Sequence, residues 1–374
     1  MPDFLNIPTA EQFQELINVQ RLLAGKGVQD ITNSPGPKTL LRGDTNAGFY
    51  GFVQPSEMGL IAGNVAGKQD FSGSNLALAV GISQGTEFNI NVPLMKFHYK
   101  GKVLFIPLTG YRHTVAWDAI YNAGAVFGTS DEGLLPPAGR MGTDLTIDAT
   151  DNSINCTKQR FLGNKSAEQD YADTVGAVGD ALVLKGWANE ANNKTVTIVS
   201  ITDTKIVVSG ATLVSETGGK KSRFYNLSKA VTQNKQVKIG DKTYKVRLMK
   251  GAGENPVDTY SDADRGAAGP DNEWNSLILP LHEHAKAGNW IYPAYAVDPA
   301  GVKITSDWGI GLTDENLRTH YNFGSGSYTW CQEIIDTANW RRVGRGSYGA
   351  SYLNNNSSWG ANSYFCWRPV LESL

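Results

Sequence analysis

The carboxyl-terminal stretch is the most informative part of this chain. It begins with RRVGRGSY at residues 341–348, continues through a segment rich in aromatic and small polar residues, and closes with WRPVLE at residues 367–372. No charged residue lies between Tyr348 and Tyr364. Such a mixture does not form a continuous core strand, because asparagine and serine need hydrogen-bond partners that a dry interior lacks.

Two interpretations of the segment stay open. Tyrosine, tryptophan, serine, glycine and asparagine build adaptable recognition surfaces, where stiff rings supply contact area and small polar groups supply hydrogen bonds. A long structural loop packed on its own aromatic rings has the same composition. Under the first interpretation, the binding residues are Tyr348, Tyr352, Asn354, Asn355, Asn356, Trp359, Asn362 and Tyr364.

The composition favours a turn-rich β protein over a helical bundle. Of 374 residues, 41 are glycine, 10% are aromatic and only 19% are charged. The net charge of -2 offers no electrostatic footprint for nucleic acid. No apolar run is long enough to span a bilayer, so we expect no membrane insertion. The amino terminus lacks a basic region followed by an apolar one, so we expect no secretory signal.

The three cysteines, Cys156, Cys331 and Cys366, include no C-x-x-C pair. This pattern excludes a cysteine-rich zinc site and a disulfide-dense scaffold. A bond between Cys331 and Cys366 is conceivable because both flank the carboxyl-terminal part, but separate buried thiols are favoured.

Local patterns predict a helix followed by many short strands. A helix-start signature at 9–12 and apolar residues at helical spacing up to Gly25 predict an amino-terminal helix. Glycine and Asn/Asp residues then separate short apolar runs, which predict strands. These runs are Phe49–Val53, Leu76–Val80, Phe97–Tyr99 and Val103–Pro107. Residues 117–124 predict a short helix that ends at a glycine cap.

Residues 143–224 have a different texture. Alternating runs rich in β-branched residues predict strands, with a turn at 189–193 between two of them. The runs lie at 145–147, 153–156, 179–186, 194–200, 205–208 and 213–216. This series interrupts the motifs on either side, so we expect an inserted domain whose ends lie close together.

Taken in order, these motifs resemble known proteins. The R-V-x-R-G-S, polar segment and W-R-P-V-L elements resemble the end of the C-type-lectin-like fold in formylglycine-generating enzymes and in phage surface proteins. The elements at 95–118, 244–252, 273–278 and 330–333 look like the order found in tailed-phage virion proteins. The G-D-x-Ø-x-Ø-x-G and T-V-T-I-V-S runs resemble a small β-barrel module inserted into phage tail and virion proteins.

The resemblance implies an α+β, β-rich fold in which a C-type-lectin-like domain is interrupted by a small antiparallel β-barrel. Its parts are a helical docking segment at 1–35, a discontinuous lectin-like domain at 36–142 and 225–374, and the barrel at 143–224. The implied function is a non-enzymatic virion structural protein: a tail fibre, whisker, collar or decoration component. Implied partners are other virion proteins, copies of itself in a trimer, and a host receptor or glycan.

The alternative is an enzyme of the formylglycine-generating-like fold or a carbohydrate-active protein. In those oxidases, metal-binding cysteines follow the R-G-S element closely, whereas residues 348–353 contain none here. Cys366 stands alone, and a single soft ligand does not form such a copper site. Scattered loop carboxylates also lack the fixed separation of a glycosidase pair.

Three further motifs have structural and functional interpretations. Arg42-Gly43-Asp44 matches an integrin-type tripeptide, but a turn explains it. His282-Glu283-His284 lacks a third ligand nearby, so a hydrogen-bonded pair at the surface is favoured over a metal site. Carboxylates in the loop at 258–273 include the calcium candidates Asp262, Asp264 and Asp271, although their spacing differs from an EF-hand and a solvated acidic loop is favoured.

Overall fold

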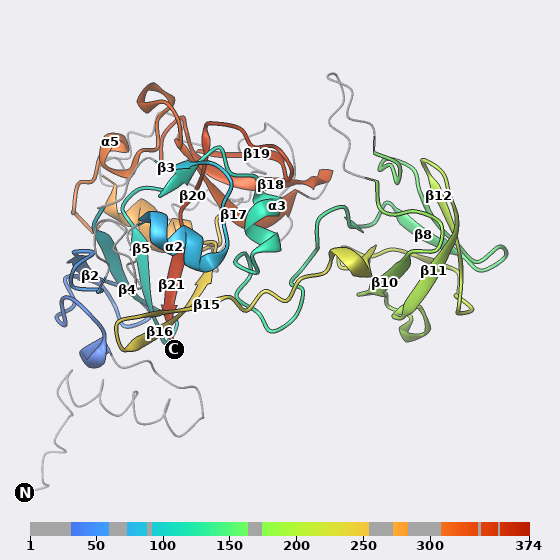
Figure 1. Cartoon of the computed structure of the whole chain (residues 1–374), viewed down its shortest axis with the longest axis horizontal. Coiled ribbons are helices and arrows are strands. Elements are labelled where there is room, and N and C mark those ends of the chain that lie inside the picture. The colour runs from blue at the N-terminus through green and yellow to red at the C-terminus, as the bar shows by residue number, and fades with distance from the viewer. Residues whose placement is uncertain are drawn as a thin grey trace, which may run out of the picture.

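The computed structural model describes residues 31–59, 73–87, 92–163, 174–253, 272–282, 308–335, 338–350 and 352–374. Within these ranges the chain is β-rich, with three sheets and a few short helices (Figure 1). The expected β-rich class is therefore confirmed, while the expected amino-terminal helix lies outside the described residues. The helical elements are α2 (Gly73–Val80), α3 (Trp117–Asn122), α5 (Asp314–Leu317), a π-helical turn (Trp274–Ile278), and 3-10 turns at Ile31–Asn33, Glu190–Asn192, Leu227–Lys229, Leu279–Leu281 and Tyr321–Phe323.

Sheet A has seven antiparallel strands in the spatial order β1-β2-β4-β5-β21-β16-β15. The carboxyl-terminal strand β21 therefore lies in the middle of the sheet, between strands from distant parts of the chain. The bounds are β1 Arg42–Gly43, β2 Ala47–Val53, β4 Leu94–Tyr99, β5 Lys102–Pro107, β21 Val370–Ser373, β16 Lys242–Arg247 and β15 Gln236–Ile239.

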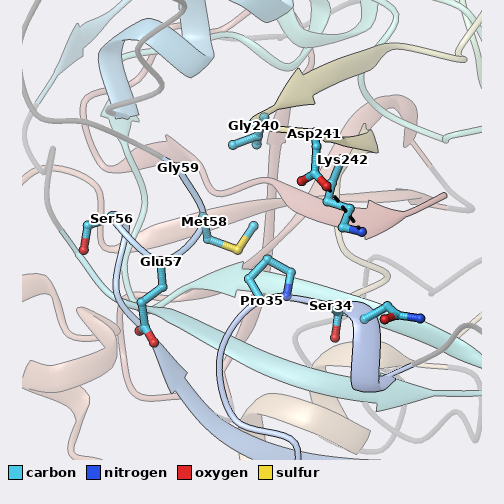
Figure 2. A pocket seen from close by; sticks show the side chains of 11 residues that line it. Ser34, Pro35, Ser56, Glu57, Met58, Gly59, Gly240, Asp241 and Lys242 are labelled. Carbon is cyan, nitrogen blue, oxygen red and sulfur yellow. Dashed lines mark ion pairs between the residues drawn. The ribbon is translucent and has the colours of Figure 1, made fainter.

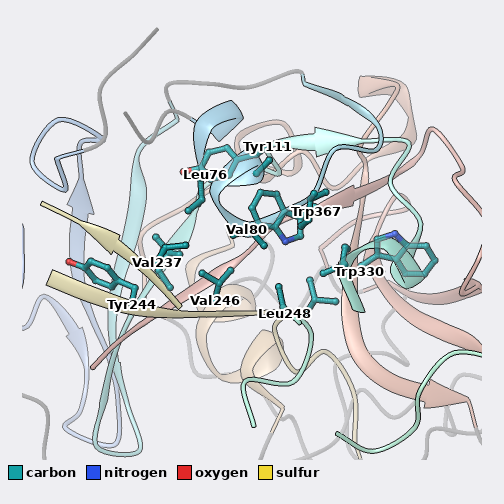
Figure 3. Packing of buried hydrophobic residues seen from close by; sticks show 14 of the residues in the cluster. Leu76, Val80, Tyr111, Val237, Tyr244, Val246, Leu248, Trp330 and Trp367 are labelled. Atoms are coloured by element: carbon teal, nitrogen blue, oxygen red, sulfur yellow. The ribbon is translucent and has the colours of Figure 1, made fainter. Parts of the chain in front are cut away.

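Both faces of sheet A are covered, which explains why all six residues of β4 are buried. Leu94 belongs to a buried cluster with Leu76 and Val80 of α2. Figure 3 shows Leu76 and Val80 on the side of the sheet where Val237 and Val246 also lie. Met95 points the other way, into a cluster that includes Trp274 of the π-helical turn. Because successive strand residues face opposite sides, a strand covered on both faces is buried along its whole length.

Sheet B has six strands in the order β19-β18-β17-β20-β6-β3. Its strands are antiparallel except for the parallel pair β17 and β20. Trp330 of β17 and Trp367 of β20 are fully buried in the cluster shared with sheet A, so the two sheets have one core. The bounds are β19 Leu353–Ser357, β18 Ala338–Gly346, β17 Tyr328–Ile335, β20 Phe365–Trp367, β6 Arg112–His113 and β3 Thr86–Glu87.

The chain end crosses from sheet B to sheet A at Arg368 and Pro369. The buried end of the chain is therefore two strands, β20 and β21, because Pro369 has no N–H to donate to a ladder. Arg368 is fully buried, and it donates to the carbonyl oxygens of Pro107 at 2.7 Å and Leu108 at 2.6 Å.

Sheet C has eight antiparallel strands in the order β13-β8-β9-β12-β11-β10-β14-β7, all within residues 140–226. It stands apart from the other two sheets (Figure 1). Among the described residues its outer strands, β13 and β7, do not pair with each other, so a closed barrel is not seen. The bounds are β13 Glu216–Thr217, β8 Leu145–Asp148, β9 Ser153–Cys156, β12 Lys205–Ser209, β11 Thr195–Ile201, β10 Ala181–Lys185, β14 Arg223–Asn226 and β7 Arg140–Met141.

Two local predictions were wrong. The run Leu76–Val80 lies in helix α2 instead of a strand, because Leu76, Ala77 and Val80 face the core at helical spacing while Leu78 is 57% exposed. Alanine also favours a helix. The run at 213–216 forms no strand before Glu216, where the two-residue strand β13 begins. Asn152 and Asn192 side chains instead accept the N–H groups of Leu213 and Val214.

Candidate recognition surface

The three consecutive asparagines lie on β19, the edge strand of sheet B. Asn354 is opposite Gly344 and Asn355 is opposite Val343 of β18. Leu353 is buried in a small cluster with Val343, which anchors one face of the strand. Residues 353–357 therefore form a strand, and they are not part of the long structural loop that one interpretation of the segment predicted.

Side-chain amides order this strand edge. The Oδ1 atom of Asn354 accepts the N–H of Asn355 at 2.8 Å, and Oδ1 of Asn356 accepts the N–H of Ser357 at 2.8 Å. The guanidinium of Arg341 donates to Oδ1 of Asn355 at 3.0 Å. Because side chains occupy backbone donors of an edge strand, they oppose pairing with another strand. The asparagines are half-buried, so they combine a structural role with partial access to solvent.

A row of aromatic rings runs from the surface into the core beside this edge. Tyr348 is 41% exposed, and its ring centroid lies 4.9 Å from that of Tyr352. Tyr352 lies 6.4 Å from Tyr328, which stacks on Phe365 at 4.6 Å. Phe365 in turn lies 4.0 Å from the buried Trp330. The exposed ring is thus supported by rings with little freedom to move.

Tyr364 and Asn362 lie at the same end of sheet B. The N–H of Tyr328 donates to the carbonyl oxygen of Tyr364 at 2.8 Å, and Tyr364 is 46% exposed. Oδ1 of the exposed Asn362 accepts the N–H of Tyr364 at 2.9 Å. We call Tyr348, Tyr352, Asn354, Asn362 and Tyr364 the tyrosine surface.

Tyr352 precedes β19 and Trp359 follows it, so these two residues lie at opposite ends of the strand. The carbonyl oxygen of its neighbour Ser358 accepts the N–H of Asp118 in α3 at 2.9 Å, which places this turn next to α3. Trp359 is half-buried. The predicted set therefore divides into the tyrosine surface, the strand residues Asn355 and Asn356, and Trp359 at the far end.

Tyr328 supports the tyrosine surface from below and is itself uncharged at neutral pH. Burial raises its pKa to about 12. Its hydroxyl accepts a hydrogen bond from Nδ2 of Asn354 at 2.8 Å. Because the phenol stays protonated at neutral pH, this contact joins two neutral groups, consistent with the lack of charged residues between Tyr348 and Tyr364.

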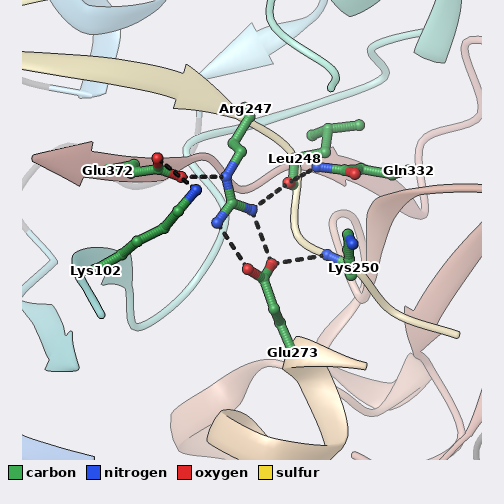
Figure 4. Close-up of polar contacts among 7 residues, drawn as sticks. All are labelled: Lys102, Arg247, Leu248, Lys250, Glu273, Gln332 and Glu372. Carbon is green, nitrogen blue, oxygen red and sulfur yellow. Dashed lines mark hydrogen bonds and ion pairs between the residues drawn. The ribbon is translucent and has the colours of Figure 1, made fainter. Parts of the chain in front are cut away.

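A buried ion network links three strands of sheet A to Glu273, which directly precedes the π-helical turn. Arg247 donates to both carboxylate oxygens of Glu273, at 2.8 and 2.7 Å, and to Glu372 at 3.0 Å (Figure 4). Burial acts to lower the pKa of Arg247, but the two carboxylates outweigh it and raise that pKa. Lys102 donates to Glu372 at 2.8 Å. Each charge has a partner, so the network ties neighbouring strands of sheet A to the start of the π-helical turn.

The calcium prediction falls mainly outside the described residues. Asp262, Asp264 and Asp271 are in that undescribed part of the chain. Glu273, which ends the same acidic segment, is bound to Arg247 instead of facing a loop. Within the described ranges, no group of three or more histidine, cysteine or acidic residues is arranged to hold a metal ion.

The other motifs form local contacts. Asp44 Oδ1 accepts the N–H groups of Asn46 at 2.7 Å and Ala47 at 2.8 Å, so Arg42-Gly43-Asp44 leads into a tight turn. His282 is buried, and its Nε2 lies 3.2 Å from Oδ1 of Asp314. Glu283 and His284 lie outside the described residues. His282 is thus buried beside a carboxylate, and does not lie at the surface as the motif predicted.

The carboxyl group of Glu333 has a raised pKa, but it does not line the hollow described below. Burial raises the pKa of Glu333 to about 7, and its Oε2 accepts the Gly251 N–H at 2.9 Å. A hollow of ≈ 360 Å³ lies elsewhere, and Figure 2 shows its lining near Met58 and the turn at Gly240. The hollow includes the Lys242–Asp241 ion pair at 3.7 Å. Its lining lacks the raised carboxyl, so the two features do not form one site.

The cysteines are three buried free thiols. Burial raises the pKa of Cys156 to about 12 and that of Cys366 to about 11, and it raises the pKa of Cys331 well above its ordinary value. Protonated buried thiols are poor nucleophiles. The structure thus has separate thiols, as the sequence favoured.

No family model, curated protein or solved structure matches the chain. Within the described residues, no helix is both long and apolar enough to cross a membrane. The site therefore has to be interpreted from its own geometry. Sequence reasoning missed Tyr328 and Phe365, which support the tyrosine surface, because they lie on other elements that only strand pairing and tertiary contacts bring close.

Proposed function

We propose that this protein is a non-enzymatic virion structural component of a tailed phage that displays the tyrosine surface to a host receptor or glycan. The observation that carries the recognition role is the exposed Tyr348 ring, held by Tyr352 above the buried Tyr328. Rigid aromatic groups bind with little loss of conformational entropy. The virion role is supported by the motif order described above and would place the protein on a tail fibre, whisker, collar or decoration.

The chemistry of the surface favours a neutral, hydroxyl-rich ligand. Tyr348 and Tyr364 offer partly exposed rings, and Asn362 offers an exposed amide nearby. Rings contact the apolar faces of sugars, and amides bind their hydroxyl groups, without requiring an ion pair. An uncharged glycan is therefore the ligand class that we propose.

We further propose the finer architecture that the motifs imply. Sheets A and B would form a C-type-lectin-like domain, sheet C would be a small β-barrel insert, and residues 1–35 would include a docking helix. The insert would act as a spacer or lateral contact in a homotrimer. Supporting this proposal, sheets A and B share one core, whereas sheet C has its own cluster of buried residues.

Substitution at the tyrosine surface tests the binding role. We expect Tyr348→Ala with Tyr364→Ala to weaken binding of the purified protein to its best ligand on a neutral glycan array at least tenfold, since one contact aromatic is often worth about 2 kcal/mol. Both residues are exposed, so the melting temperature should change little. Leu78→Ala, an exposed residue on α2, is the matched control.

Three results would contradict the proposal. One is unchanged glycan binding in the double variant, and another is the absence of binding by the unmodified chain to glycans and to host cells. The third concerns location: antibodies against the chain should label a defined structure on intact phage particles in electron micrographs. Particles without labelling would exclude the virion role.

A further inference from the structure

The stretch from Ser347 to Ala350 sets the position of Tyr348. Ser347 has a φ of 70° and Gly349 a φ of 119°, both in the left-handed half of the backbone map. A non-glycine residue at such φ values is strained, so surrounding contacts must hold Ser347 in place. A side chain at residue 349 would be strained too, and its Cβ would lie 3.7 Å from the Asp314 carboxylate.

Asp314 makes the central contact to this stretch. Its Oδ1 atom accepts the N–H of Ala350 at 2.8 Å and the hydroxyl of Thr319 at 2.6 Å, and it lies 3.2 Å from Nε2 of His282. The carbonyl oxygen of Thr319 then accepts the N–H of Gly349 at 2.8 Å. Asp314 therefore holds the stretch directly and through Thr319.

Asp314 is itself fixed in place. It is the first residue of α5, whose preceding residue Thr313 forms a capping box with Asn316. Backbone hydrogen bonds hold the segment around His282. The backbone N–H of His282 donates to the carbonyl oxygen of Leu279 at 3.0 Å, and that of Leu312 donates to the carbonyl oxygen of Leu281 at 2.8 Å. The carboxylate thus joins a capped helix, a buried histidine and the tyrosine-bearing stretch.

We infer that Asp314 is a positioning residue that sets the orientation of Tyr348 and Tyr352 for ligand binding. The binding part of this inference rests on the proposed function. The Asp314 side chain is only 17% exposed, and Tyr348 and Tyr352 bracket the residues it holds. An orientation fixed before binding reduces the entropy lost in the complex, so loss of this contact lowers affinity without removing any ligand contact.

Burial and hydrogen bonding act on Asp314 in opposite directions. Burial acts to raise its pKa, but hydrogen bonds from His282, Thr319 and Ala350 outweigh it and lower that pKa. Asp314 is therefore a carboxylate at neutral pH. Hydrogen bonds to a charged acceptor are stronger than those between neutral groups, which suits a single atom that holds several partners.

Amide exchange tests the positioning role without reference to any ligand. In Asp314→Ala we expect the Ala350 and Gly349 amides to exchange about tenfold faster or more, the loss expected for one hydrogen bond to a charged group. Amides of β11 in sheet C should be unchanged. Asp314→Asn keeps an acceptor oxygen and should recover much of the protection. Unchanged exchange at Ala350 in Asp314→Ala would overturn the inference.

Binding and a measurement on the unmodified protein complete the test. Glycan affinity should fall at least about fivefold in Asp314→Ala and recover partly in Asp314→Asn. If exchange rises while affinity is unchanged, positioning for binding is refuted. If the unmodified chain binds no ligand, the proposed function fails, but the exchange result still decides whether Asp314 holds Ala350.

If the alanine variant does not fold, the unmodified protein provides the test. Its Ala350 amide proton resonance should shift as Asp314 protonates in acid, and an unchanged resonance would refute the contact.

Discussion

The side-chain amine of Lys96 is buried in sheet A. It lies in β4, is fully buried, and donates through Nζ to the carbonyl oxygen of Pro37 at 2.7 Å. The rings of Tyr50 and Phe105 lie 6.0 Å from Nζ, and no carboxylate in the described part of the chain pairs with it. Burial and, to a lesser extent, the charge of Lys38 lower the pKa of Lys96 to about 7.

This lysine predicts a stability that rises with pH. Between pH 7 and the ordinary lysine pKa of 10.5, the unfolded chain binds a proton at Lys96 that the folded chain does not. The contribution of Lys96 to the free energy of unfolding is therefore most favourable above pH 10.5, where its amine is neutral in both states. This contribution is lost as the pH falls toward 7. Urea denaturation should show the free energy of unfolding of the wild type rising from pH 7 to 10 relative to Lys96→Met. Parallel pH curves for the two proteins would contradict this assignment.

At the residue scale, the sequence indicated which residue types suit a surface, but it did not show which of them bond to neighbours within the protein. Tyr348, Tyr364 and Asn362 are exposed as a recognition surface requires. Asn354 instead bonds to Tyr328, and Asn355 accepts from Arg341. Composition indicates which side chains suit binding, but an amide serves a ligand or a neighbour equally well. Only the contacts across strands distinguish the two roles.

At the scale of elements, strands were predictable where both local pattern and burial agreed. β5 and β11 follow their predicted runs closely, because an apolar or alternating run fits a strand with one or two covered faces. Helix α2 was mistaken for a strand because Leu76-Ala77-Leu78-Ala79-Val80 also fits helical spacing over so short a length. The division of the end into β20 and β21 depends on which sheet each half joins, and that is a long-range property.

β21 predicts that the carboxyl terminus is needed for folding. The strand pairs with β5 on one side and β16 on the other, and Val370 and Leu371 are fully buried. Each such side chain contributes about 1.5–3 kcal/mol through burial. Truncation after Phe365 also removes Trp367 and Arg368, so we expect insoluble protein after expression. Removal of Leu374 alone, which is 58% exposed, is the control and should leave the protein soluble. Soluble, cooperatively folding protein after the longer truncation would show that β21 is peripheral.

At the scale of the whole molecule, sequence order and spatial order differ most. Sheet A brings together strands from residues 42–107, 236–247 and 370–373, and sheet B joins residues 86–113 to 328–367. No local pattern specifies these pairings, because they depend on which distant strands share a core. Sheet C contains only residues 140–226, and the sequence texture changes over nearly the same stretch, residues 143–224. A continuous segment with its own core leaves a local signal that a discontinuous domain does not.

This organisation predicts that residues 143–224 can be replaced by a short Gly/Ser linker. The two ends already meet, since the Gly142 N–H donates to the Ser222 carbonyl oxygen at 2.9 Å and Met141 pairs with Arg223. Every residue of the buried cluster in sheet C lies between Leu145 and Phe224.

The replacement would also remove polar contacts with the flanking residues. The carbonyl oxygen of Arg160 accepts from the buried Arg140 guanidinium at 2.7 Å, and the carbonyl oxygen of Met141 accepts from the Gln159 side chain at 3.0 Å. The Asp180 carboxylate accepts from Asn226 at 2.8 Å, and Lys185 forms an ion pair with Glu132, which also accepts the Tyr225 hydroxyl at 2.6 Å. Because the cores of sheets A and B stay intact, the remainder should unfold in one cooperative transition close to the melting temperature of the matching transition in the full chain. Glu132→Gln in the full chain measures what the lost ion pair contributes by itself. If the linker variant aggregates while Glu132→Gln folds normally, residues 143–224 contribute to a common core, and their autonomy is refuted.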